Sequence, residues 1–92
     1  MEFEFDPAKS DANKTKHGLD FHEAQSLWSD VDAIEVPAQS ATELRRLLVA
    51  KRDNKDWTAV FTERSGRIRI ISARRSRTSE IVLYEQNDSG ES

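Results

Sequence analysis

The feature that most constrains the fold is the alternation of apolar and polar residues over positions 67–73, directly after the dipeptide Ser65-Gly66. Ile68 and Ile70 alternate with Arg67, Arg69 and Ile71, which is the two-residue period of a strand with one buried face. Arg67 and Arg69 fall on the other face, and Ser65-Gly66 favours a tight turn before the strand. The pattern therefore predicts the second strand of a hairpin, with a core on one side and two arginines on the other.

Hydrophobic patterns elsewhere predict an α+β fold. Strands are expected at residues 2–5, 33–36, 46–51, 57–62 and 67–73. Asp53-Asn54 favours a turn between the third and fourth of these, and Pro37 is expected to end the second. Trp57 and Phe61 are assigned to the core by their alternation. The sequence therefore predicts an antiparallel β-sheet meander with helices packed on one face.

Residue types typical of helix ends predict two N-terminal helices and one C-terminal helix. These are expected over residues 7–17, from residue 20 to about residue 29, and over residues 75–86. Asp6 and Pro7 suit an N-cap and a first helical position, and Gly18 suits a left-handed C-cap. Asp20 and Glu23 have the spacing of a capping box. The helices are therefore expected to flank the sheet.

The length and the amino-acid composition predict one small domain. At 92 residues without cysteine, the chain has room for one sheet and a few helices and cannot form disulfides. We expect a single domain over residues 1–86 and a disordered tail over residues 87–92. No apolar run approaches the length of a membrane span or a signal peptide, so we expect a soluble, cytoplasmic protein without membrane contact.

Positive charge is concentrated in one part of the chain. The net charge is −3, but residues 44–77 carry eleven basic and only three acidic side chains. A polyanion responds to a local patch of charge more than to the total. This distribution indicates nucleic-acid binding, and a solvated, charge-rich surface is the alternative.

An ordered set of motifs over residues 3–85 resembles the BrnT family of toxins. The motifs are Phe5-Asp6-Pro7-x-Lys9, Asn13-x-x-Lys16-His17-Gly18, Phe21-x-x-Ala24 and Arg67-x-Arg69-x-Ile71-Ser72-Ala73-Arg74-Arg75, followed by Glu80 and Tyr84. The resemblance implies a RelE/ParE-like fold and a ribonuclease toxin of a type II toxin–antitoxin system that inhibits translation. It also implies a BrnA-like ribbon-helix-helix antitoxin as partner, with DNA contacted only through the antitoxin complex.

Metal-independent RNA cleavage needs a general base, a general acid and positive charge near the reacting phosphate. His17 lies within a motif, and histidine titrates closest to neutrality, so it is the first candidate for proton transfer. It could instead stabilise the end of its helix. Glu80 is a second candidate base, or could pair with an arginine of the sheet. Arg67 completes the expected catalytic set.

Further residues are expected to bind RNA. Arginine holds phosphate oxygens in a fork and keeps its charge. The expected RNA-binding residues are Lys51, Arg52, Arg69, Arg74, Arg75, Arg77 and Tyr84. The arginines could also cover a sheet face or pair with an acidic antitoxin, and Tyr84 could pack rather than stack on a base. No cofactor or metal ion is expected, because the two histidines lack carboxylates at ligand spacing.

Two other functions remain open. One is a catalytically degenerate toxin homologue, kept as an antitoxin-binding and transcription-autoregulation module. The other is a ParE-like toxin with a target other than RNA. All of these need a basic patch, so charge alone does not separate them.

Overall fold

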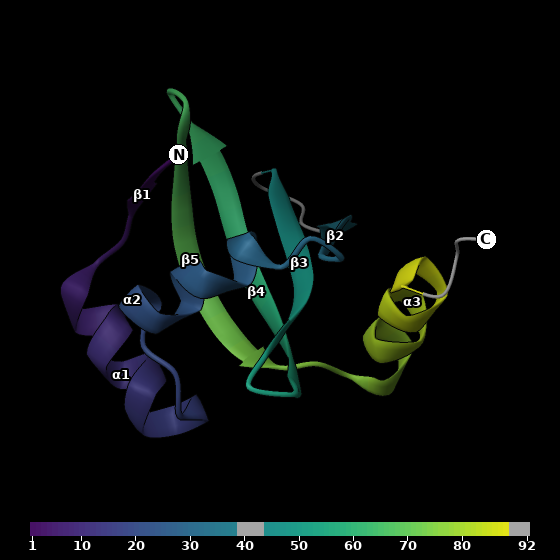
Figure 1. Cartoon of the computed structure of the whole chain (residues 1–92). Helices are drawn as coiled ribbons and strands as arrows, with labels where there is room; N and C mark the ends of the chain where they lie inside the picture. The colour runs from purple at the N-terminus through teal and green to yellow at the C-terminus, as the bar shows by residue number, and fades with distance from the viewer. Residues whose placement is uncertain (39–43, 89–92) are drawn as a thin grey trace.

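A five-stranded sheet with the order β1-β5-β4-β3-β2 forms the centre of the computed structural model (Figure 1). The structure describes residues 1–38 and 44–88. Its elements are β1 (Glu2–Glu4), α1 (Pro7–His17), α2 (Phe21–Ala24), the 3₁₀ helix η1 (Gln25–Ser29), β2 (Ile34–Ala38), β3 (Arg45–Arg52), β4 (Lys55–Arg64), β5 (Arg67–Arg75) and α3 (Thr78–Asp88). The expected α+β class is confirmed.

The sheet is mixed. Strands β2 to β5 form the expected antiparallel meander, but β1 runs parallel to β5. The prediction of a purely antiparallel sheet is therefore corrected at this edge. Parallel neighbours need a long connection, and here every element except α3 lies between the two strands in the chain. The alternation of residues within β1 does not indicate that its partner is β5, which lies far along the chain.

Both predicted hairpin turns are confirmed. Between β3 and β4, Asp53 and Asn54 have φ values of 53° and 63°, and between β4 and β5, Ser65 and Gly66 have values of 52° and 79°. Two successive positive φ angles are typical of the type I′ turn, whose twist matches that of a hairpin.

A β-bulge divides β5 into two halves. The pairing of β4 with β5 shifts between Val60 and Phe61, which leaves β5 with one extra residue. An extra residue exchanges the two faces of the strand beyond it. Ala73 consequently lies in the core. Arg74 lies on the same outer face as Arg69, although their positions differ by an odd number.

The predicted helix ends are confirmed for the first two helices. The Asp6 side chain accepts a hydrogen bond from the Ala8 amide at 2.9 Å, and Gly18 adopts the left-handed conformation with φ 89°. Asp20 and Glu23 form a complete capping box, in which each side chain accepts from the other residue's amide. Gly18 thus ends α1, and Asp20 caps the start of α2 two residues later.

Most element boundaries differ from the predictions by one to three residues. The second helix is one turn of α-helix followed by η1. Strand β2 continues through Pro37 to Ala38, which is tolerated because β2 is an edge strand and not every amide needs a partner. Helix α3 begins at Thr78, because Arg75 is still paired with Trp57 in β5.

Two expectations fall partly outside the described residues. These are the loop expected around residues 37–43, of which 39–43 is not described, and the tail expected at 87–92, of which 89–92 is not described. Helix α3 continues to Asp88, and the Asn87 side chain donates to the Asp32 carbonyl at 3.0 Å.

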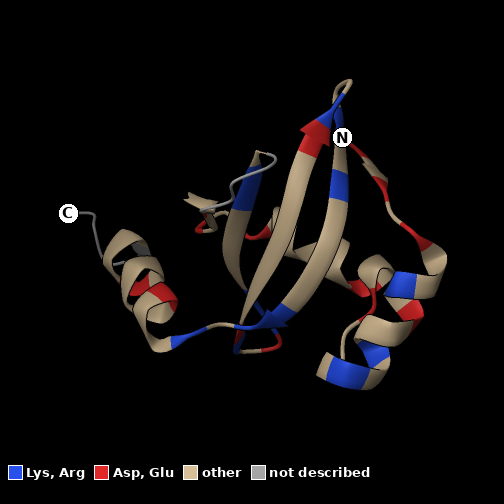
Figure 2. Ribbon diagram, turned by 180° about the vertical axis from the view of Figure 1, so that it is seen from behind, with Lys and Arg blue, Asp and Glu red and all other residues tan. Residues whose placement is uncertain are grey.

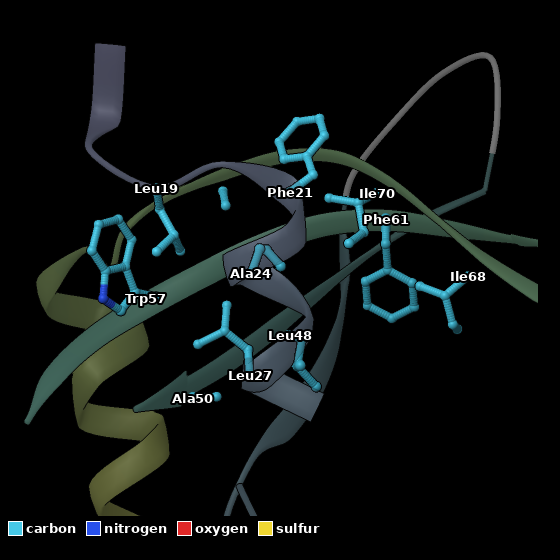
Figure 3. Close-up of a cluster of buried hydrophobic side chains, with 12 residues drawn as sticks. Leu19, Phe21, Ala24, Leu27, Leu48, Ala50, Trp57, Phe61, Ile68 and Ile70 are labelled. Atoms are coloured by element: carbon cyan, nitrogen blue, oxygen red, sulfur yellow. The ribbon is translucent and has the colours of Figure 1, made fainter. Parts of the chain in front are cut away.

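The core lies between the sheet and the layer formed by α1, α2 and η1 (Figures 1 and 3). Its residues are Leu19, Phe21, Ala24, Leu27, Leu48, Ala50, Trp57, Ala59, Phe61, Ile68, Ile70 and Ala73. The core positions expected for Trp57 and Phe61 are confirmed. No helix within the described ranges is long and apolar enough to span a membrane.

Asn13 fastens α1 to the part of β5 that extends beyond the short β1. Its buried amide donates to the carbonyls of Leu19 at 2.6 Å and Ala73 at 2.8 Å, and its side-chain oxygen accepts from the Ala73 amide at 3.3 Å. A buried backbone edge without partners is costly. Asn13 therefore completes the pairing of β5 and fixes where α1 lies.

Candidate nucleic-acid interface

A groove of about 440 Å³ opens at one end of the sheet. It is lined by Lys9, Arg45, Thr62, Arg64, Arg69 and Ile71, which we call the basic groove. Four of these six side chains are cationic, and none of the lining residues in the described part of the chain is acidic. A concave surface lined by one sign of charge concentrates the electrostatic field and attracts an anion.

Strand alternation and one helix place the cations of the basic groove. Thr62, Arg64 and Arg69 belong to positions that alternate with the core residues of β4 and β5, so they share the outer face. Arg45 reaches the same face from β3, and Lys9 comes from the first turns of α1. Figure 2, viewed from the side away from α2 and η1, shows Lys and Arg at both ends of the strands and few between them.

Strand β1 places two glutamates beside two arginines of β5. Glu2 is in register with Arg67 and Glu4 with Arg69. Arg67 Nε donates to Glu2 Oε1 at 3.0 Å, and Arg69 Nη1 donates to Glu4 Oε2 at 3.2 Å. These ion pairs lie at the side of the basic groove.

Glu80 lies at the opposite end of the sheet and is buried, with 6% of its surface exposed. Arg74 binds it through two parallel hydrogen bonds of 2.9 Å, Thr58 Oγ1 donates at 2.9 Å, and the Arg77 amide donates at 2.7 Å. Burial raises the pKa of Glu80, but the Arg74 guanidinium, the Arg77 amide and the Thr58 hydroxyl outweigh it and lower the pKa from 4.5 to about 2. The geometry is that of a structural ion pair holding the first turn of α3.

A second polar contact holds α3 against the loop after η1. Tyr84 is buried, its hydroxyl donates to Asp30 Oδ2 at 2.7 Å, and Lys51 Nζ lies 5.7 Å from the centre of its ring. The Lys51 amide donates to the same carboxylate oxygen at 2.9 Å. Burial raises the pKa of Asp30, but these donors and the Asp32 amide lower it below its usual value. The ring of Tyr84 is thus covered and packs within the fold.

Two other expected RNA-binding arginines also have partners inside the protein. Arg52 donates to Ser26 Oγ at 3.0 Å. Arg75 lies 5.6 Å from the centre of the Trp57 ring and donates to the Asp56 carbonyl at 3.1 Å. Arg77 is exposed at the start of α3. These residues lie at the Glu80 end of the sheet, away from the basic groove.

The structure does not bring His17, Arg67 and Glu80 together. Arg67 and Arg74, which binds Glu80, are separated by most of β5, or roughly 20 Å of extended strand. His17 is half-buried at the C-terminal end of α1, about 12 Å along the helix axis from Lys9. Of the expected site residues, only Arg69 lines the basic groove.

Three cations of the basic groove were not among the expected site residues: Lys9, Arg45 and Arg64. Lys9 lies within the first motif, and this position could have marked it as a candidate site residue. Arg64 continues the alternation of β4 by two residues beyond the expected end. Nothing in the local sequence around Arg45 predicts that it lines the same groove as Lys9.

Comparison with known proteins identifies one family. The model of the family described as "Ribonuclease toxin, BrnT, of type II toxin-antitoxin system" matches residues 5–80. No curated protein matches the chain. Within residues 1–38 and 44–88, no three His, Cys, Asp or Glu side chains gather closely enough to hold a metal ion.

Proposed function

The chain belongs to the BrnT family of ribonuclease toxins of type II toxin–antitoxin systems, and from this we propose that it cleaves RNA at the basic groove without a metal ion. One observation carries the proposal: four cationic side chains from β3, β4, β5 and α1 line one groove that has no acidic lining residue in the described part of the chain. The cleavage takes place in the cytoplasm and inhibits translation.

The groove cations bind and polarise a phosphodiester. In the reaction, the 2′-oxygen attacks the adjacent phosphorus in line with the departing 5′-oxygen, which gives a 2′,3′-cyclic phosphate and a 5′-hydroxyl. The phosphorane between these states carries extra negative charge, and fixed guanidinium groups stabilise it more than they stabilise the ground state. Arg45 and Arg69 serve this purpose because arginine stays protonated and offers several donors.

The reaction also moves two protons, one from the 2′-hydroxyl to a base and one to the leaving 5′-oxygen. Four donated hydrogen bonds and a pKa of about 2 favour a structural role for Glu80 over that of a general base. His17 is the proposed proton-transfer residue because it lies in one of the family motifs; since it lies about 12 Å along α1 from Lys9, the RNA would have to run from the basic groove along α1 to reach it. Arg67, two residues before Arg69 on the same face of β5, is proposed to contact a neighbouring phosphate.

The test is cleavage of a 5′-labelled RNA by the purified protein in EDTA, with identification of the product ends. We expect 2′,3′-cyclic phosphate ends. The variants Arg45→Ala and Arg69→Ala should weaken RNA binding, and His17→Ala should slow cleavage by about 10²–10⁴-fold with unchanged binding. Lys55→Ala, at the turn on the opposite end of the sheet, is the matched control. Binding without cleavage at excess protein would favour the degenerate toxin instead.

We also propose a BrnA-like ribbon-helix-helix antitoxin with an acidic segment that covers the basic groove. The positive lining of the groove supports an acidic partner. DNA binding would then belong to the complex and not to this chain. In a competition assay, the antitoxin should displace labelled RNA from the toxin. A ternary complex of toxin, antitoxin and RNA at full occupancy would contradict this.

A further inference from the structure

The N-terminal strand β1 forms two glutamate–arginine pairs with β5 that differ in burial. In the Glu2–Arg67 pair, 73% and 56% of the side-chain surfaces are exposed. In the Glu4–Arg69 pair, the values are 28% and 35%. Glu4 also lies between two arginines, because its other oxygen is 3.8 Å from Arg67 Nη1. Glu4 is therefore the more constrained of two residues of the same type on one strand.

The carboxylate of Glu4 lies beside the basic groove and not in it. Arg69 is a lining residue of the groove, whereas Glu4 is not. Only Nη1 of the Arg69 guanidinium donates to Glu4 within hydrogen-bond distance. A guanidinium has five N–H donors in a rigid plane, so the remaining ones can bind an anion in the groove. The contact with Glu4 restrains the rotation of the Arg69 side chain.

We propose that Glu4 is a positioning residue that holds the Arg69 guanidinium toward an RNA phosphodiester in the basic groove. The inference rests on the proposed function. Holding a long side chain in its binding orientation before the ligand arrives lowers the entropic cost of association. Strand β1 lies outside the matched family region of residues 5–80, so the family match does not assign this role.

The same short segment supplies a second wall of the groove. Strand β1 leads directly into α1, whose first turns carry Lys9. Asp6 caps that helix, and Asn13 fastens it to β5. The pairing of β1 with β5 therefore brings Glu4 to Arg69 and leads the chain into the helix that carries Lys9 to the same groove.

Simple electrostatics predicts the opposite result for a change at Glu4. Removing a negative charge near a site that binds a polyanion strengthens binding. A positioning role predicts that Glu4→Ala weakens RNA binding by about two- to tenfold, the cost of ordering one flexible side chain. The direction of the change therefore separates the two roles.

The experiment measures the Kd of a labelled, single-stranded RNA oligonucleotide by fluorescence anisotropy at fixed salt. We expect weaker binding for Glu4→Ala, and binding equal to or tighter than that of the parent protein for Glu4→Gln, which keeps a hydrogen-bond acceptor and removes the charge. Glu2→Ala, in the exposed pair on the same strand, should leave binding unchanged or tighter. If Glu4→Ala tightens binding as Glu2→Ala does, Glu4 screens the groove and the proposal is wrong.

A double-mutant cycle with Arg69→Ala excludes a general loss of structure. If Glu4 acts through Arg69, then Glu4→Ala has no weakening effect once Arg69 is alanine. If the double variant is weaker by the full factor again, β1 has only a structural role and the proposal is overturned.

Arg45→Ala distinguishes failure of this inference from failure of the proposed function. Suppose that Arg45→Ala and Arg69→Ala weaken RNA binding and Glu4→Ala does not. That result rejects only the role of Glu4. Unchanged binding by both arginine variants rejects the basic groove as the RNA site, and the role of Glu4 with it.

Discussion

The two ends of β5 each carry an arginine–glutamate pair on the same outer face of the sheet, and the two pairs are built differently. Arg74 and Glu80 are largely buried, with 19% and 8% of their side-chain surfaces exposed, and they share two hydrogen bonds. Arg69 and Glu4 are more exposed and share one. Burial and full pairing make the first a structural contact. Partial pairing leaves the second arginine with donors for a ligand.

The difference shows that an arginine-rich strand need not be a binding surface along its whole length. At the Glu80 end, the Thr58 hydroxyl and the Arg77 amide donate further hydrogen bonds to the carboxylate that Arg74 already binds. At the groove end, cations from four elements approach without an acidic residue among the described lining residues. The same side-chain type therefore forms a fully paired, buried contact at one end of β5 and lines an open groove at the other.

The largest expected effect is on stability at the Glu80 end. Glu80→Ala leaves the Arg74 guanidinium buried without its partner, which should lower the free energy of unfolding by about 3–5 kcal/mol. Glu4→Ala, in the more exposed pair, should lower it by less than about 1 kcal/mol. Urea unfolding followed by tryptophan fluorescence measures both. Equal losses for the two variants would contradict the division between a structural and a binding pair.

The pH dependence of stability should depend on the same carboxylate. The folded pKa of Glu80 is about 2, below its ordinary value of 4.5. Because the folded pKa is lowered, the contribution of ionised Glu80 to the free energy of unfolding is fully present above about pH 5. It is lost as the pH falls toward 2, and amounts to on the order of 3 kcal/mol in total. Urea unfolding between pH 5.5 and about pH 2 should show this loss. In the Glu80→Gln variant, the free energy of unfolding should change much less with pH. The change that remains comes from Asp30, whose pKa is also lowered.

The smallest expected effect is on RNA affinity and its salt dependence. Arg64→Ala should weaken binding a few-fold and reduce the slope of log K against log salt concentration by about 0.7, the value for one phosphate contact with a single strand. Arg75→Ala, at the Glu80 end, should leave the slope unchanged, because its guanidinium lies over Trp57. An equal change for both variants would show that the RNA runs along the whole of β5.

Residues close together in the chain determined much of the fold. The caps at Asp6 and Gly18, the capping box and both hairpin turns follow from residue type and spacing, because each requires a local backbone conformation or a hydrogen bond within a few residues. The alternation of β4 and of the first half of β5 likewise predicted that Trp57, Phe61 and Ile68 enter the core. The concentration of basic residues in 44–77 indicated an anion-binding surface.

Only the tertiary structure decided which charged residues meet. The bulge in β5 moves Arg74 to the outer face, where it reaches Glu80, whereas regular alternation from Ile68 and Ile70 would place Arg74 on the core side. The parallel pairing of β1 brings Glu4 to Arg69 and Lys9 to the groove. These contacts join residues far apart in the chain, and their geometry depends on how the helices pack against the sheet. The sequence by itself therefore determined that the chain carries a concentration of basic residues, whereas packing decided which arginines pair with Glu80 and which line the basic groove.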